Sequence, residues 1–114
     1  MSERELIKLI EETKQGLRFK VIVKSEEKEE KLLLEGGDLV FTTPEVDVAG
    51  RLNAALKRFL VKIGFPQNRI EITYGCKKKT KIIEVKDMSK EDALKLLLDY
   101  FRSMHKSQSN IYES

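Results

Sequence analysis

One short segment combines residue types that could bind an anion. Gly50 allows a ligand to approach the backbone, Arg51 carries a fixed positive charge, and Asn53 offers a donor and an acceptor. If a helix begins here, its unpaired first amides favour a phosphate or carboxylate. The candidate residues for this anion or small-ligand site are Asp47, Gly50, Arg51, Asn53 and Lys81. The alternative is that Asp47 or a neighbour caps the helix and Asn53 bonds a nearby loop.

A second group of residues surrounds three consecutive lysines. Adjacent lysines on a turn can follow a nucleic-acid backbone through phosphate contacts that do not depend on base sequence. The candidate nucleic-acid-binding residues are Lys57, Arg58, Lys62, Lys77, Lys78 and Lys79. The alternative is a solvated turn whose lysines protect a sheet edge from aggregation. Tyr74 is the only aromatic residue near this turn, so the sequence offers no platform for stacking bases.

Charge is unevenly distributed along the 114 residues. The chain has a net charge of +3, whereas residues 50–81 contain nine Lys and Arg against Glu71 alone, which is +8 and leaves −5 for the rest. Segregation of this size points to an anionic partner, for which RNA or another polyanion is the first hypothesis.

Several kinds of chemistry are disfavoured by composition. Cys76 is the only cysteine and His105 the only histidine, so neither a disulfide framework nor a structural zinc site is expected. No carboxylate spacing matches a calcium loop, and no phosphate-binding motif occurs. Asp38, Asp47 and Asp87 could do acid–base work, but their spacing is equally that of turn and cap residues. We therefore expect no metal, no cofactor, and an exposed, inert thiol at Cys76. Without a membrane-spanning apolar run or a signal-peptide pattern, the expected location is the cytoplasm, with no membrane association.

Hydrophobic periodicity predicts an α+β fold. Alternation predicts a strand over residues 17–24, and an apolar face made by Leu52, Leu56, Phe59, Leu60 and Ile63 predicts a central helix over 50–63. A final helix starts at Ser89, with Leu94, Leu97, Leu98, Phe101 and Met104 expected to be buried. Further elements are a helix at 3–14, a charged loop at 25–31, and strands at 32–34, 39–43, 69–74 and 80–86, the last two joined by a basic turn.

These elements predict a two-layer fold with a four-stranded, mainly antiparallel or mixed sheet in the order β-β-α-β-β-α, preceded by an added helix. The predicted division is an N-terminal helical extension at 1–16, one domain at 17–106 and a flexible polar tail at 107–114.

Two segments resemble the YggU-like family of small uncharacterised proteins. Residues 44–47 followed by 50–56, PEVD and GRLNAAL, are similar to the family's P-x-V-D-G-K-A-N-A-A-L segment, and residues 75–81, GCKKKTK, are similar to its G-x-x-S-R-x-K turn. Val48 and Ala49 are inserted relative to that pattern, and Lys78 and Lys79 replace its Ser and Arg. The resemblance covers residues 17–85 and implies a sheet with helices packed against it. It implies no established activity.

Three hypotheses of different classes follow, in order of preference. The first is a polyanion-binding module that uses the basic stretch. The second is an enzyme or small-ligand protein with the anion site at the start of the central helix. The third is a protein-interaction subunit that docks a partner through the acidic loop at 26–30 or the N-terminal helix. A basic face without a pocket favours the first, a pocket beside Asn53 the second, and an apolar stripe on the N-terminal helix the third.

Overall fold

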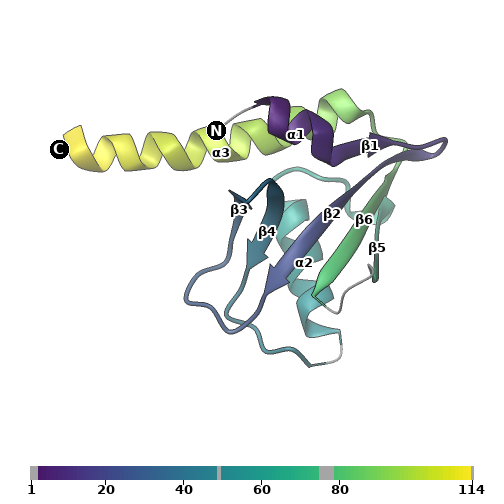
Figure 1. Ribbon diagram of the computed structural model, residues 1–114, viewed down its shortest axis with the longest axis horizontal. Coiled ribbons are helices and arrows are strands. Elements are labelled where there is room, and N and C mark those ends of the chain that lie inside the picture. The colour runs from purple at the N-terminus through teal and green to yellow at the C-terminus, as the bar shows by residue number, and fades with distance from the viewer. Residues whose placement is uncertain (1–2, 49, 75–78, 114) are drawn as a thin grey trace.

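The computed structural model describes residues 3–48, 50–74 and 79–113, with side chains described in these ranges as far as residue 104, apart from Tyr74. The chain has an α+β fold in which a twisted sheet packs against helices (Figure 1). In chain order the elements are α1 (Glu3–Leu9), β1 (Ile10–Glu12), β2 (Gly16–Lys24), β3 (Lys31–Glu35), β4 (Asp38–Thr42), α2 (Arg51–Lys62), the 3₁₀ turn η1 (Gln67–Arg69), β5 (Ile70–Tyr74), β6 (Thr80–Lys86) and α3 (Lys90–Glu113).

The sheet is mixed and has six strands rather than the four predicted. Its order is β3-β4-β2-β6-β5, and β1 pairs with β2 outside this path. Only the β2–β4 pair is parallel, and the other pairs are antiparallel. The strands predicted at 32–34 and 39–43 are both present, as the hairpin β3–β4. The strand that was not predicted is β1, because residues 10–12 pair with β2 and the first helix ends at Leu9 instead of residue 14.

The core lies on the face of the sheet that α2 covers. The alternation in β2 is confirmed, since Leu17, Phe19, Val21 and Val23 are each at most 2% exposed. From α2, the predicted residues Leu52, Leu56, Phe59 and Leu60 are buried together with Ala55, whereas Ile63 is only partly buried. Burying these side chains against the sheet explains why an amphipathic sequence forms a helix here.

The N-terminal segment belongs to the same core. Leu6 is 0% and Ile10 1% exposed, although the sequence placed both in an extension outside the main domain. Gly16, at the end of this segment, lies directly against the backbone of β6. A Cβ built on Gly16 would lie 2.0 Å from the carbonyl oxygen of Val85, so only glycine fits there without a backbone shift. Residues 3–16 are therefore integral to the packing.

Helix α3 differs from its prediction in two ways. Its N-terminus has the predicted cap, since the backbone N–H of Asp92 donates to the hydroxyl oxygen of Ser89 at 3.1 Å. Its buried residues are Ala93, Leu97 and Phe101, while the predicted core residues Leu94, Leu98 and Met104 are only partly buried. The helix also continues to Glu113, through residues that the sequence assigned to a tail, and Figure 1 shows it running past the sheet.

Tyr100 of α3 closes one edge of the sheet. The backbone N–H of Leu32, in the edge strand β3, donates to the Tyr100 hydroxyl oxygen at 3.1 Å. The Tyr100 ring meets Phe59 of α2 edge-on, with 5.3 Å between ring centroids. Burial raises the pKa of Tyr100 above the ordinary value for tyrosine, although the bond from Leu32 acts in the opposite direction.

In the part of the chain that is described, no helix is both long and apolar enough to span a membrane.

Candidate nucleic-acid interface

The start of α2 and the start of β6 lie at the same end of the molecule. Parallel strands β2 and β4 finish at this end, and the segment after β4 leads directly into α2 (Figure 1). Strand β6 begins there, because Thr80 pairs with Ile22 near the end of β2. The fold thus brings Gly50, Arg51 and Asn53 to the end of the sheet from which Lys79 and Lys81 enter β6.

Lys81 points into the protein rather than toward solvent. It pairs with Val21 and shares a side of β6 with Ile83 and Val85, and it is only 6% exposed. It also has an interaction within the chain. A residue this deeply buried is poorly placed to receive an external ligand, so the charge at this position adds little to the surface.

The start of α2 is only weakly suited to an anion. Gly50 adopts a left-handed conformation (φ 80°) with no side-chain cap bond, so Asp47 does not cap the helix. This leaves first-turn amides without a side-chain partner. However, the Arg51 guanidinium lies 3.9 Å from the Glu45 carboxylate, and Asp47 places a second carboxylate in the same segment. These acids oppose the attraction that the helix dipole and Arg51 would exert on an anion.

Asn53 adds a separate argument at this position. Its Oδ1 atom is buried and, among the described residues, has no hydrogen-bond partner. An amide oxygen accepts hydrogen bonds, so it calls for a donor such as an ammonium, a hydroxyl or water. An anionic ligand carries acceptors and would be repelled from this atom. The chemistry at the start of α2 therefore does not converge on an anion.

The outer face of α2 carries a different set of charges. Arg51, Arg58 and Lys62 are seven and four residues apart, which aligns them along one side of the helix, and Lys57 lies about 100° or more around the helix from this line. The helix contains no Asp or Glu. Arg58 and Lys62 are exposed, and Lys57 is half-buried. Within the described ranges, neither these three residues nor exposed Lys79 forms an ion pair.

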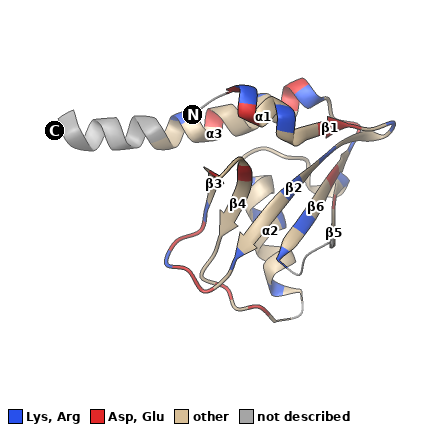
Figure 2. Cartoon of the chain, in the orientation of Figure 1, with Lys and Arg blue, Asp and Glu red and all other residues tan. Residues whose placement is uncertain are grey.

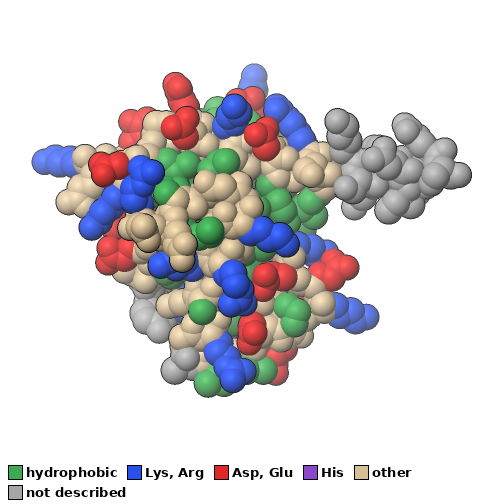
Figure 3. All heavy atoms as spheres, turned by 180° about the vertical axis from the view of Figure 1, so that it is seen from behind, with side chains coloured by type: hydrophobic (Ala, Val, Ile, Leu, Met, Phe, Trp, Pro, Cys, Tyr) green, Lys and Arg blue, Asp and Glu red, His purple; other side chains and the backbone are tan. Residues whose placement is uncertain are grey.

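Figure 3 shows the molecule from behind, with side chains coloured by type. Lys and Arg side chains stand out from this surface, and Asp and Glu side chains lie beside them. The acidic residues near α2 in the chain include Glu45, which reaches Arg51. The uncompensated part of the basic surface is therefore the stretch formed by Lys57, Arg58 and Lys62.

The opposite, open face of the sheet also carries cations, and the three that β2 contributes each have a carboxylate partner. Figure 2 marks where the charged residues lie along these strands. Three ion pairs join β2 to β1, β4 and β3, namely Arg18–Glu11 at 3.0 Å, Lys20–Asp38 at 3.6 Å and Lys24–Glu35 at 3.0 Å. The Arg18 guanidinium makes two hydrogen bonds to the Glu11 carboxylate, which lower the pKa of Glu11 and raise that of Arg18. Sequence reasoning did not identify these pairings, because they depend on strand register.

Several predicted features lie elsewhere or outside the described residues. Lys77, Lys78 and Cys76 fall outside them, so their predicted roles stay predictions. On α1, Ile7 is 38% exposed while Leu6 is buried.

A shallow pocket of about 250 Å³ lies against α3 and α1, away from Asn53. Among the described residues, no group of three or more His, Cys, Asp and Glu side chains could hold a metal ion.

No known family model matches the chain.

Proposed function

We propose that the protein binds a polyanion, with nucleic acid as the ligand class, through the outer face of α2. The observation that carries this proposal is the set of Lys57, Arg58 and Lys62 on a helix without acids, none of them in an ion pair within the described ranges. Cations without a carboxylate partner are available to neutralise phosphates and release their counterions. Arg51 extends the same line toward the end where Lys79 is exposed.

The chemistry of this face favours binding to the backbone rather than recognition of bases. Lys and Arg contacts to phosphates position a protein without selecting a sequence. The exposed positions of α2 other than the cations are small or aliphatic, such as Ala54 and partly exposed Val61, and offer no ring on which a base could stack. The expected activity is therefore salt-sensitive binding to single-stranded or duplex nucleic acid of unrelated sequences.

A salt titration of the triple variant K57Q/R58Q/K62Q tests this proposal. Fluorescence anisotropy with a labelled single-stranded RNA and a labelled duplex DNA gives affinity at each salt concentration. Each lost duplex contact reduces the slope of log affinity against log salt by about 0.9, so the variant's slope should be shallower by roughly two to three. The loss should be similar for unrelated sequences.

A matched control removes the same charge from another region. Lys8, Lys14 and Lys86 are exposed and have no ion pair among the described residues. K8Q/K14Q/K86Q should largely retain binding if α2 is the interface. Equal weakening by both variants would show that only net charge matters, and wild-type protein that fails to bind at low salt would exclude the proposal.

A further inference from the structure

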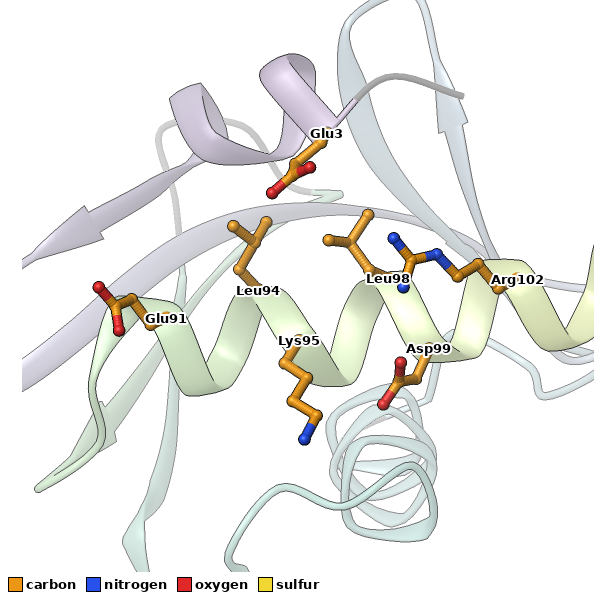
Figure 4. Close-up of a pocket in the computed structure, with 7 residues that line it drawn as sticks. All are labelled: Glu3, Glu91, Leu94, Lys95, Leu98, Asp99 and Arg102. Atoms are coloured by element: carbon orange, nitrogen blue, oxygen red, sulfur yellow. The ribbon is translucent and has the colours of Figure 1, made fainter.

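Helix α3 has an outward face that its own chain leaves largely uncovered. Its inward side packs against the rest of the protein through Ala93, Leu97 and Phe101. The outward side forms the floor of the shallow pocket, to which Glu3 of α1 also contributes (Figure 4). The α3 residues that line it are Glu91, Leu94, Lys95, Leu98, Asp99 and Arg102. Their spacing of three and four residues places them on one side of the helix.

This face combines apolar and charged groups in an ordered way. In Figure 4, Leu94 and Leu98 point toward α1, while Lys95 and Asp99 point away from it. The two leucines are only partly buried. In the described part of the chain, Glu91, Lys95, Asp99 and Arg102 take part in no ion pair. The face thus presents an aliphatic edge beside two acidic and two basic side chains that form no ion pair among the described residues.

The arrangement is complementary to itself when one copy is reversed. In an antiparallel pairing centred between residues 96 and 97, Glu91 lies opposite Arg102 of the second copy. Within about one residue of the same centre, Lys95 lies opposite Asp99 and Leu94 opposite Leu98, a tolerance well under one helical turn. Like charges are not placed opposite each other at any of these positions. The three pairings have centres that differ by at most one residue, about 1.5 Å of helix rise, so one antiparallel arrangement brings all of them within reach.

The lateral positions match as well. A two-fold axis that lies between facing helices and crosses them at right angles keeps each edge of one helix against the same edge of the other. The edge with Leu94 and Leu98 then meets its own counterpart, as does the edge with Lys95 and Asp99. The Glu91–Arg102 pair and the Lys95–Asp99 pair each occur twice, once on either side of the two-fold axis, as an isologous interface requires.

We infer that the protein self-associates through this face, with α3 packing antiparallel to α3 of a second copy. Charge complementarity selects a second copy over an unrelated partner. The contact spans about three helical turns. Three turns bury less surface than the roughly 1,200–2,000 Å² of a stable interface, so the dimer is weak and depends on protein concentration. Because Leu96 and Tyr100 place α2 against the other side of α3, the dimer leaves the cations of α2 exposed.

Sedimentation velocity of the whole chain over a range of concentrations tests the inference. Wild-type protein should shift from monomer toward dimer as concentration rises, and the shift should weaken with added salt because the charged groups are exposed. Lys95→Glu places two carboxylates opposite each other at two symmetric positions. It should raise the dissociation constant at least about tenfold, since attraction becomes repulsion. Lys95 is exposed, so folding is retained, as circular dichroism can verify.

The charge-swap variant K95E/D99K makes the test specific. It exchanges the two members of each pair and should restore association to near the wild-type level, which a general loss of positive charge cannot explain. Lys86→Glu gives the same change in net charge away from the face and should leave the dissociation constant unchanged. A wild-type protein that stays monomeric at every concentration overturns the inference. So does a Lys95→Glu variant that associates as well as the wild type, or a charge swap that fails to rescue it.

Discussion

The open face of the sheet and the outer face of α2 both carry exposed Lys and Arg, yet the two surfaces differ in compensation. Arg18, Lys20 and Lys24 each meet a carboxylate from a neighbouring segment. Lys57, Arg58 and Lys62 meet none among the described residues. The difference arises because strands lie next to charged strands, whereas one side of a surface helix faces only water. The availability of a charge therefore depends on what the fold places beside it.

Strand register explains how the sheet face becomes compensated. Arg18 lies directly opposite Glu11 in the β1–β2 pair. Lys24 of β2 and Glu35 of β3 are not paired in register, and their side chains reach each other across β4. Between them lies a row of paired residues formed by Leu33, Val40 and Ile22. Val40 is only 3% exposed although it faces away from α2. The paired side chains thus also shield aliphatic residues, which is a structural role rather than a binding role.

The largest expected effect contrasts the residues beneath the two faces. Leu56→Ala should lower the free energy of unfolding by about 2–5 kcal/mol, because Leu56 is 0% exposed and seats α2 on the sheet. Ile22→Ala, at a half-buried position on the open face, should cost roughly half of that or less. Chemical denaturation measures both. A cost below about 1 kcal/mol for Leu56→Ala would mean that α2 packs through another face.

The next effect concerns the edge strand that carries Glu35. Tyr100→Phe removes the acceptor for the Leu32 N–H and should lower the free energy of unfolding by about 1–2 kcal/mol. Denaturation of the variant measures this loss. Leu98→Ala, at a partly exposed position on the same helix, gives a comparison that leaves the edge bond intact. If Tyr100→Phe has no effect, water replaces the hydroxyl and the edge is not held by α3.

The same tyrosine gives stability a dependence on alkaline pH. Because burial raises the pKa of Tyr100 in the folded protein, the unfolded chain loses this proton first as pH rises. Tyr100 therefore contributes full stability below about pH 10, the ordinary tyrosine value, and that contribution falls as pH rises further. The decline between pH 9 and 11 should be steeper in wild type than in Tyr100→Phe. Parallel curves for the two proteins would contradict the direction of the shift.

The smallest effect compares the two charged faces directly. K20Q/K24Q removes two ion pairs from the sheet and should lower the free energy of unfolding by up to about 1 kcal/mol, whereas K57Q/K62Q should change it by less than about 0.5 kcal/mol. In about 1 M salt, where exposed charges are screened, the difference should disappear. Equal losses in both variants would indicate that the cations of α2 are also compensated.

Local patterns predicted much of this fold. The alternation of residues 17–24 and the apolar face of α2 reflect burial on one side, and both are confirmed by the buried side chains. Residues 10–12 show why the remainder was not predicted. Their helical pattern continues that of α1, but pairing with β2 gives them hydrogen bonds and a site for Ile10 that a helix would not provide. Tertiary pairing of this kind overrides local preference.

The candidate site was predicted in part for a related reason. Connectivity alone brings the start of α2 to the same end as β6. The sequence could not predict which of the charged side chains stay exposed and unpaired, because Lys81 turns inward opposite Val21 and Arg51 approaches Glu45. Arg69 likewise donates to the backbone oxygen of Asp87 at 2.8 Å. A count of charges along the sequence includes all three, whereas the surface offers fewer to a ligand.

The position of β2 in the sheet has a consequence for the order of events during synthesis. This strand is made early, but β6, which pairs with it from Gly16 to Ile22, follows late and ends at Lys86. At ribosomal rates of about 5–20 residues per second, the roughly 60 residues between the end of β2 and the end of β6 take about 3–12 s to add. During this interval Leu17, Phe19 and Val21 have no β6 beside them. The nascent chain therefore holds an unfinished hydrophobic strand for seconds, and chaperone binding at residues 16–24 is expected before release but not afterwards.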